Sequence, residues 1–484
     1  MRRIALLSLG VLLVAGCTVG PDYEQPEYIV PDIWRAEAVE GLATGEANLQ
    51  TWWTGLGDPI LEDLIRRAQE SNLGLREALM RIDEARALFG VASGQYWPGV
   101  DASGVVSRQD LSDNSALGQA LPGTFDPTNL YDVGLDSTWE IDVFGRIRRS
   151  VESAGAGYEA AIEDYRDVLV TLLAEVALSY TEVREFQARI QYAEANVENQ
   201  RATRQMTRDR HEGGAVSELD VAQAESNLKN TEAGIPALEI ALNTSLNRLA
   251  VLLAQPPGAV HEELAAAAVL PFPPESLTAG IPADLMRQRP DIRRAERLLA
   301  SQTARIGVAK ADLYPRFSLS GFFAVQASAS GDLFTSDSKT WGISLPFRWN
   351  IFQGGRIRSA IDAEEARTEQ ALVRYERSVL LALEDVENAL TAYSLERNRR
   401  DRLAEATIAT ERAVELVQTQ YKEGLTDFQN VLDMERSLTA QQDQLAASES
   451  AVIKNLIVLY KALGGGWDPN AGTPNTETTP PATP

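Results

Sequence analysis

The sequence predicts a membrane β-barrel joined to a long α-helical coiled-coil barrel, built by tandem duplication with four strands per chain. Three observations predict this fold class. A set of residues recurs at a nearly constant offset, segments of about ten residues alternate between apolar and polar positions, and stretches of about 60 residues lack proline. Together they describe a repeated unit of a helix, two strands and two very long helices.

The internal repeat sets the domain boundaries. Trp349 follows Trp139 by 210 positions, and the offset continues between the Gly-Arg-Ile-Arg runs at 145–148 and 355–358. Upstream the offset becomes 217, as between Gly90 and Gly307, so one insertion of about seven residues separates the strands of the first copy. We expect a first repeat over 58–255, a linker or equatorial belt over 256–289, and a second repeat over 290–466.

The strands have the length and pattern of membrane strands. Within the strand expected over 131–143, residues 133–143 alternate, with apolar Leu135, Trp139 and Ile141 opposed to polar Asp136 and Glu140, and 340–351 repeats the pattern. Their partners are expected near 97–107 and 315–326. Four strands cannot close a barrel, and an open edge in lipid leaves backbone groups unpaired. Several chains must therefore contribute, so the sequence predicts an oligomer, in which three copies would supply twelve strands.

The polar face of these strands would line the barrel lumen. The lumen candidates are Asp136, Glu140 and Asp142, whose charge predicts a mild preference for cations. The loops near 108–130 and 327–340 are long and polar, which is typical of the extracellular side. The alternative is a soluble β-sandwich, although its strands are more often about five or six residues long.

The helices are long enough to form a duct. A proline-free stretch from Arg146 to about Arg210 would reach roughly 90 Å as a helix. Its seam is spaced alternately by three and four residues, as in a coiled coil. Glycine-containing turns near 211–217 and 421–427 end the long helices, and Pro236 is expected to kink the first return helix. The seam residues are Val176, Ser179, Val183, Phe186, Ile190, Ala193 and Val197, then Val379, Leu383, Val386, Leu390, Tyr393, Val414, Val417, Tyr421, Leu425 and Phe428.

The N-terminus has the form of a lipoprotein signal. Two arginines, an apolar run over 4–14 and Ala-Gly-Cys at 15–17 predict a signal peptide over 1–16. The end of this run resembles the bacterial lipobox, which implies lipidation of Cys17 at the start of a segment over 17–57. By the same resemblance, Thr18 favours sorting to the outer membrane of a Gram-negative bacterium. The alternative is an ordinary secretory signal whose cysteine is incidental.

Composition excludes several functions. Asp plus Glu outnumber Lys plus Arg by 69 to 45, a formal net charge of −24, which disfavours a nucleic-acid partner. One cysteine and two histidines predict no disulfide and no metal site. The chain lacks a phosphate-binding loop and a nucleophile elbow, so we expect no cofactor and no enzymatic activity. The tail over 467–484, rich in Thr, Pro and Asn, is expected to be disordered.

Four motifs, in order along the chain, resemble the TolC-like outer-membrane efflux channel family, in its NodT-type lipoprotein branch of RND efflux systems. They are Gly-Cys-Thr-Val-Gly-Pro-Asp-Tyr at 16–23, Trp-Trp…Gly-Asp-Pro within 52–59, Trp-Glu-Ile-Asp-Val-Phe-Gly-Arg at 139–146, and Arg-Pro-Asp-Ile-Arg-Arg-Ala-Glu at 289–296. The resemblance implies a homotrimer with a twelve-strand barrel in outer-membrane lipid and a twelve-helix periplasmic duct. It also implies two partners, a periplasmic adaptor (membrane fusion protein) and an inner-membrane RND-type pump.

The resemblance also implies roles at the helix tips. The expected adaptor contacts are Arg210, Gly213, Gly214, Ser217, Gly424, Thr426 and Asp427. The alternative for the glycines is that they serve only as turn formers. Relatives often carry Asp and Arg before the second-copy tip tyrosine, whereas Gln418 and Gln420 precede Tyr421 here. The constriction candidates are therefore Asp209, Glu411, Glu415 and Gln418, against the alternative that the carboxylates are solvated surface charges.

The leading function is a passive exit duct for small toxic compounds or drugs. A second transport hypothesis is type I protein secretion or metal efflux, although five scattered methionines form no copper-binding run. A hypothesis of another class is a structural coiled-coil lipoprotein that does not conduct.

Overall fold

The computed structural model describes residues 18–27, 34, 42–43, 49–110, 112, 115, 126–268, 270, 277–278 and 288–468. The expected signal peptide, Cys17 and the tail from 469 onward lie outside these residues. The chain forms two compact units. The first takes in the described residues of 1–26, 83–160 and 295–374, and the second those of 27–82, 161–294 and 375–484.

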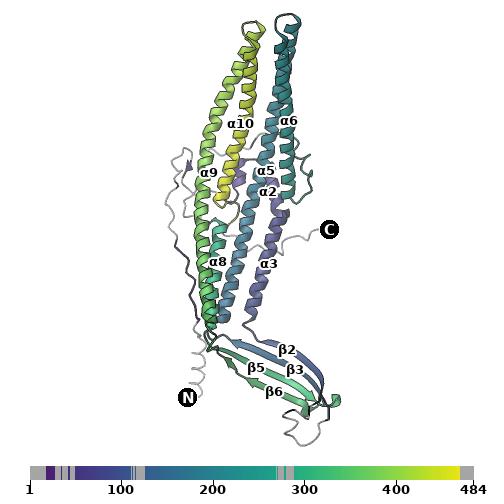
Figure 1. Cartoon of the computed structure of the whole chain (residues 1–484), viewed down its shortest axis with the longest axis vertical. Helices are drawn as coiled ribbons and strands as arrows, with labels where there is room; N and C mark the ends of the chain where they lie inside the picture. Colours follow the sequence, from purple (N-terminus) through teal and green to yellow (C-terminus); the bar gives the residue numbers. More distant parts are fainter. Residues whose placement is uncertain are drawn as a thin grey trace. The chain divides into compact units, whose positions relative to one another are not determined.

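The first unit contains an antiparallel sheet in the order β2-β3-β5-β6 (Figure 1). Its strands are β2 (Gly99–Gln109), β3 (Thr128–Ile141), β5 (Arg316–Ala327) and β6 (Lys339–Ser344). The short β7 (Phe347–Arg348) also pairs with β5. Strand β3 pairs along most of its length with β2 on one side and β5 on the other. The two copies of the repeat therefore meet at the centre of the sheet, where β3 of the first copy pairs with β5 of the second.

Two strand boundaries differ from the expected ones. The strand expected over 340–351 is divided, because Pro346 has no N–H to donate and lies between β6 and β7. Its carbonyl still accepts a hydrogen bond from the Ser318 backbone N–H at 3.0 Å. Strand β3 ends at Ile141, so Asp142 lies beyond the strand that was expected to contain it.

The duplication extends to individual hydrogen bonds. The Trp139 indole N–H donates to the Tyr96 carbonyl at 2.9 Å, and the Trp349 indole N–H donates to the Leu313 carbonyl at 2.9 Å. The donors are 210 positions apart and the acceptors 217, as the repeat offsets require. Trp139 therefore joins β3 to the turn after α3, and Trp349, directly after β7, makes the equivalent bond to the turn after α8.

The helices have the lengths that the sequence predicts. They are α2 (Pro59–Ser71), α3 (Leu73–Gly94), α5 (Arg146–Glu212), α6 (Glu218–Leu252), α8 (Pro290–Ala311), α9 (Arg356–Lys422) and α10 (Phe428–Ala462). Helices α5 and α9 have 67 residues each, and α6 and α10 have 35 each. Helix α6 is continuous through Pro236. No helix in the described part of the chain is both long and apolar enough to span a membrane.

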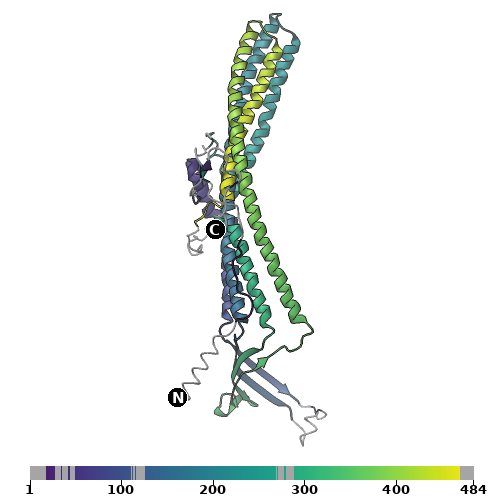
Figure 2. The ribbon, with the colours of Figure 1, turned by 90° about the vertical axis from the view of Figure 1, so that its left-hand side faces the viewer.

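In the second unit, the hairpins α5–α6 and α9–α10 lie side by side with their turns at the same end (Figure 2). The expected seams are mostly buried, as at Val176, Val183, Val379 and Val386. Leu425 is an exception and is 72% exposed, because it lies in the turn after α9 rather than on the helix.

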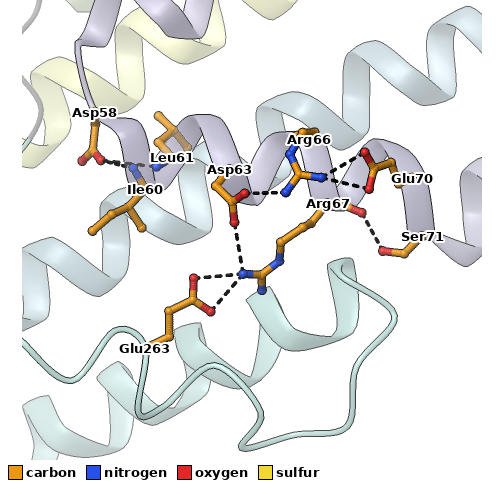
Figure 3. A network of polar contacts seen from close by, with 9 residues as sticks. All are labelled: Asp58, Ile60, Leu61, Asp63, Arg66, Arg67, Glu70, Ser71 and Glu263. Carbon is orange, nitrogen blue, oxygen red and sulfur yellow. Dashed lines mark hydrogen bonds and ion pairs between the residues drawn. The ribbon is translucent and has the colours of Figure 1, made fainter.

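The start of the first repeat is anchored by its Gly-Asp-Pro motif (Figure 3). One carboxylate oxygen of Asp58 caps α2 by accepting from the Ile60 backbone N–H at 2.9 Å, and the other accepts from the Tyr180 hydroxyl at 2.5 Å. Burial raises the pKa of Tyr180 to about 12, so the hydroxyl keeps its proton for this bond. Arg67 also bonds both oxygens of Glu263, at 2.9 and 3.0 Å, which ties α2 to the segment after α6.

Candidate functional site

The candidate site is the pair of hairpin turns in the second unit and the polar layer just beneath them. Both turns need a glycine, because Gly214 has φ of +74° and Gly424 has φ of +75°. Ser217 caps α6 by accepting from the Asp220 backbone N–H at 3.4 Å. At the equivalent place before α10, Asp427 makes no capping bond with its side chain.

Arg210 joins the two turns. Its guanidinium donates to the backbone carbonyl of Tyr421 and lies 4.5 Å from the centre of the Tyr421 ring. A side chain at Gly424 would begin 3.7 Å from the same guanidinium. The Tyr421 ring packs at 5.5 Å on Phe428, within a small apolar cluster. Arg210 therefore holds the first hairpin to the second at their ends.

Beneath this cluster lies a buried carboxylate that all four helices of the two hairpins surround. Glu435 on α10 is 5% exposed and accepts from Thr203 of α5 at 2.5 Å, Gln418 of α9 at 3.1 Å and Asn227 of α6 at 3.5 Å. Burial raises the pKa of Glu435 above its usual range, while the three donors act in the opposite direction. Glu435 is therefore the polar centre of the layer under the tips.

The constriction candidates take different places. Asp209 and Glu411 are exposed and accept from Gln205 and Gln442, at 2.8 and 3.0 Å. Glu415 forms an exposed ion pair with Arg412 at 2.7 Å. Gln418 instead points into the polar layer and donates to Glu435, so its amide is already engaged within one chain.

Sequence reasoning did not single out Glu435 as a site residue. Its position in the repeat was visible, because Glu435 follows Glu225 by 210 positions. The two carboxylates nevertheless differ: the Glu225 side chain is 45% exposed and pairs with Arg204 at 3.1 Å. Only the packing of the helices makes one copy buried and the other exposed, and no local pattern in the sequence encodes this.

The lumen candidates are also separated by the structure. Asp136 lies on β3, is exposed and accepts from the Ser103 hydroxyl at 3.1 Å. Glu140 forms two bonds with Arg146, at 2.8 and 2.9 Å, which neutralise its charge. Asp142 accepts from the Arg148 backbone N–H at 2.8 Å, at the start of α5. Asp142 also forms an ion pair with the Arg148 side chain at 3.3 Å. Asp136 is therefore the candidate of the three for which the described residues show no ion pair with an arginine.

Two further observations on the described residues bear on ligand binding. No group of three His, Cys, Asp or Glu side chains could hold a metal ion in the part of the chain that is described. A solvent-open groove of about 560 Å³ lies below the tips, between α5, α6 and α10. Its polar lining includes Arg189, Asn196, Asn227, Arg436 and Asp443.

The pattern that defines the outer membrane efflux protein family matches residues 64–255 and 281–465. The chain belongs to the outer membrane efflux protein family. The match divides at the linker between the two repeats.

Relatives support this membership over nearly the whole length. Nodulation protein T of Rhizobium leguminosarum bv. trifolii is 32% identical, over 95% of this chain and 97% of its own. The pyoverdine export outer membrane protein OpmQ of Pseudomonas aeruginosa is 31% identical, over 96% of this chain and 97% of its own length.

Solved structures agree in fold. The outer-membrane channel OprN is 36% identical with a TM-score of 0.87, covering 93% of this chain and all of its own. The open state of the Neisseria gonorrhoeae MtrE outer membrane channel is 28% identical with a TM-score of 0.82, covering 93% and 99%. This efflux protein is therefore an outer-membrane channel component that extends into the periplasm.

Proposed function

We propose that three copies of this efflux protein form the passive exit duct of a tripartite pump, which carries small toxic compounds across the periplasm and outer membrane. The chain itself performs no chemistry in this proposal. The energy for transport comes from an inner-membrane RND-type pump, to which a periplasmic adaptor connects the duct.

The open sheet of the first unit carries the proposal. Strands β2 and β6 form its two edges, and apolar side chains such as Val106, Trp341 and Ile343 are 71–76% exposed along them. Unpaired strand edges in lipid cost several kcal/mol per backbone group, so the edges need partners. Because the four strands of the path β2-β3-β5-β6 alternate in direction, β6 of one copy and β2 of the next would again be antiparallel. Three copies would close a ring of twelve long strands.

Attachment and docking complete the proposal. Cys17 would carry lipid, since the residues before it have the form of a lipobox. The adaptor would contact the turns at Gly213, Gly214, Ser217, Gly424, Thr426 and Asp427. Arg210, already bonded to Tyr421, would be positioned to respond to that contact because it joins the hairpins. Asp209, Glu411 and Glu415 remain candidates for the constriction, while the bond to Glu435 makes Gln418 the weakest of the four.

The names of relatives favour small organic substrates. They include a pyoverdine export protein, a solvent efflux protein and a toluene efflux protein, which are 30–31% identical to this chain. These names support a duct for small molecules over a duct for secreted proteins.

Conductance across a planar lipid bilayer tests the proposal. The purified protein is expected to conduct ions in discrete steps, and Arg210→Ala is expected to raise the conductance or the fraction of time open. Arg208→Ala is the matched control, because Arg208 is an exposed arginine two residues away on the same helix. A protein that inserts into bilayers and conducts in neither form would support a structural coiled-coil lipoprotein instead.

A further inference from the structure

Residues 18–23 pack into a socket on the first unit. Gly145, Arg149 and Gly307 form this socket. The Val19 backbone N–H donates to the Phe144 carbonyl at 3.1 Å, at the junction of β3 and α5. Arg149 of α5 is 3% exposed and donates to the carbonyls of Val19 and Gly20, at 3.2 and 3.3 Å. It also bonds the Asp22 carboxylate at 2.6 Å.

Three glycines allow this close approach. A Cβ at Gly20 would lie 2.4 Å from the Gly307 Cα, and a Cβ at Gly307 would lie 2.6 Å from the Arg149 Cγ and 2.9 Å from the Val19 carbonyl oxygen. A Cβ at Gly145 would lie 2.7 Å from the Thr18 Cγ2. Real Cβ contacts are essentially never this short. The contact between residues 18–23 and the socket therefore has no room for a side chain at any of these three glycines.

The docked segment touches both copies of the repeat. Phe144 and Arg149 belong to the first copy, whereas Gly307 on α8 belongs to the second. The Tyr23 hydroxyl donates to Glu296 of α8 at 2.8 Å, and the Arg297 guanidinium lies 5.5 Å from the Tyr23 ring centre. Residues 18–23 thus form a clasp across α5 and α8.

The socket is not a remnant of the duplication. Position 359 corresponds to Arg149 in the second copy and holds serine, so the buried arginine exists only where the clasp docks. Gly90 corresponds to Gly307 in the first copy, and a Cβ there would meet nothing within 4 Å. A buried arginine is costly unless its donors are satisfied, and here the clasp supplies three of its acceptors.

We propose that this socket is a specific docking site for the mature N-terminus, where residues 18–23 fasten the first repeat to the second at the junction of strand and helix. The clasp also sets where the membrane anchor attaches, because Cys17 directly precedes Thr18. This second part rests on the proposed lipidation, whereas the docking itself does not.

Hydrogen exchange of the full-length protein in detergent, followed by mass spectrometry, tests the docking. The peptide that covers Cys17 to Tyr23, and so retains the label on the Val19 amide, is expected to exchange slowly in the wild type and about tenfold or more faster in Gly307→Ala. Gly90→Ala is the matched control and is expected to leave that peptide unchanged. Alanine favours a helix over glycine at both positions, so only the clash at Gly307 distinguishes the variants. Arg149→Lys, which keeps the charge but loses the forked donors, is expected to act like Gly307→Ala.

Two results would overturn the docking: a wild-type peptide that exchanges at the rate of an unstructured chain, or equal exchange in Gly307→Ala and Gly90→Ala. Cys17→Ser separates the docking from the lipid. If the socket holds the segment, Cys17→Ser keeps the slow exchange, whereas loss of protection would show that the lipid holds it. Conductance measured on the same samples reports on the proposed channel function independently.

Discussion

Replacing Glu435 with alanine should loosen the layer beneath the hairpin tips. The change removes a 5% exposed carboxylate and leaves three donors, on Thr203, Gln418 and Asn227, without their acceptor. A hydrogen bond to a charged group contributes about 1.5–3 kcal/mol, and a stranded buried donor costs a comparable amount. We therefore expect a loss of about 2–3 kcal/mol in the local free energy of opening.

Hydrogen exchange of peptides from the tip ends of α9 and α10 measures this loss. A loss of about 2–3 kcal/mol corresponds to exchange roughly 30- to 150-fold faster. Glu225→Ala is the matched control, because Glu225 occupies the equivalent position in the first repeat but forms a partly exposed ion pair with Arg204. Such a pair is worth at most about 1 kcal/mol. Equal effects of the two substitutions would refute the central role of Glu435.

The same residue predicts a pH dependence with a definite sign. Burial raises the pKa of Glu435 above its ordinary value of 4.5, so the folded tip binds this proton more tightly than the unfolded chain. The stabilisation that comes from binding this proton is therefore complete below about pH 4.5 and is lost as pH rises through the raised pKa, whereas the hydrogen bonds to the ionised carboxylate remain. Glu435→Gln, which resembles the protonated form, should flatten this part of the profile. A variant whose profile matches that of the wild type would contradict the burial argument.

Three further predictions concern the strands, the turns and the anchor. Leu135→Arg, on the apolar face of β3, should destabilise the membrane-inserted protein by about 2–4 kcal/mol in a refolding assay. Thr138→Arg, on the polar face of the same strand, should destabilise it much less. If Thr138→Arg were the more destabilising of the two, the apolar and polar faces would be assigned wrongly. Gly424→Ala should lower the local stability of its turn by about 1–2 kcal/mol, because Gly424 has a positive φ. Gly213→Ala should leave the local stability unchanged, because Gly213 has no positive φ. Hydrogen exchange of the turn peptides distinguishes the two variants. Cys17→Ser should weaken membrane attachment in a fractionation assay more than it weakens transport, and loss of trimers in this variant would contradict the proposal that the strands also anchor the chain.

Much of the fold could be predicted from the sequence because its main features are periodic. Alternation along 131–143 and the long proline-free stretches are local patterns, and the offsets of 210 and 217 relate whole elements to each other. The interruption of the last strand follows from Pro346, a local signal that the alternation around it concealed. Leu425 was assigned to a seam because its spacing fits, although Gly424 had already ended the helix.

The candidate site was less predictable, because its parts meet through tertiary packing. The turn glycines and Arg210 were visible from position in the chain, but the bond from Arg210 to Tyr421 joins residues 211 positions apart. The burial of Glu435 depends on four helices, whereas the side chain of its repeat equivalent Glu225 is about half exposed. Likewise, the pairing of Glu140 with Arg146 became evident only from the path of the chain between β3 and α5.

One chain supplies too few long strands to enclose a pore in lipid. The mass of the detergent-extracted particle shows whether several chains complete the ring. Native mass spectrometry should therefore give three chains per particle, and the protein should need detergent to stay in solution. A mature, delipidated chain that remains a monomer in water without detergent would contradict the account.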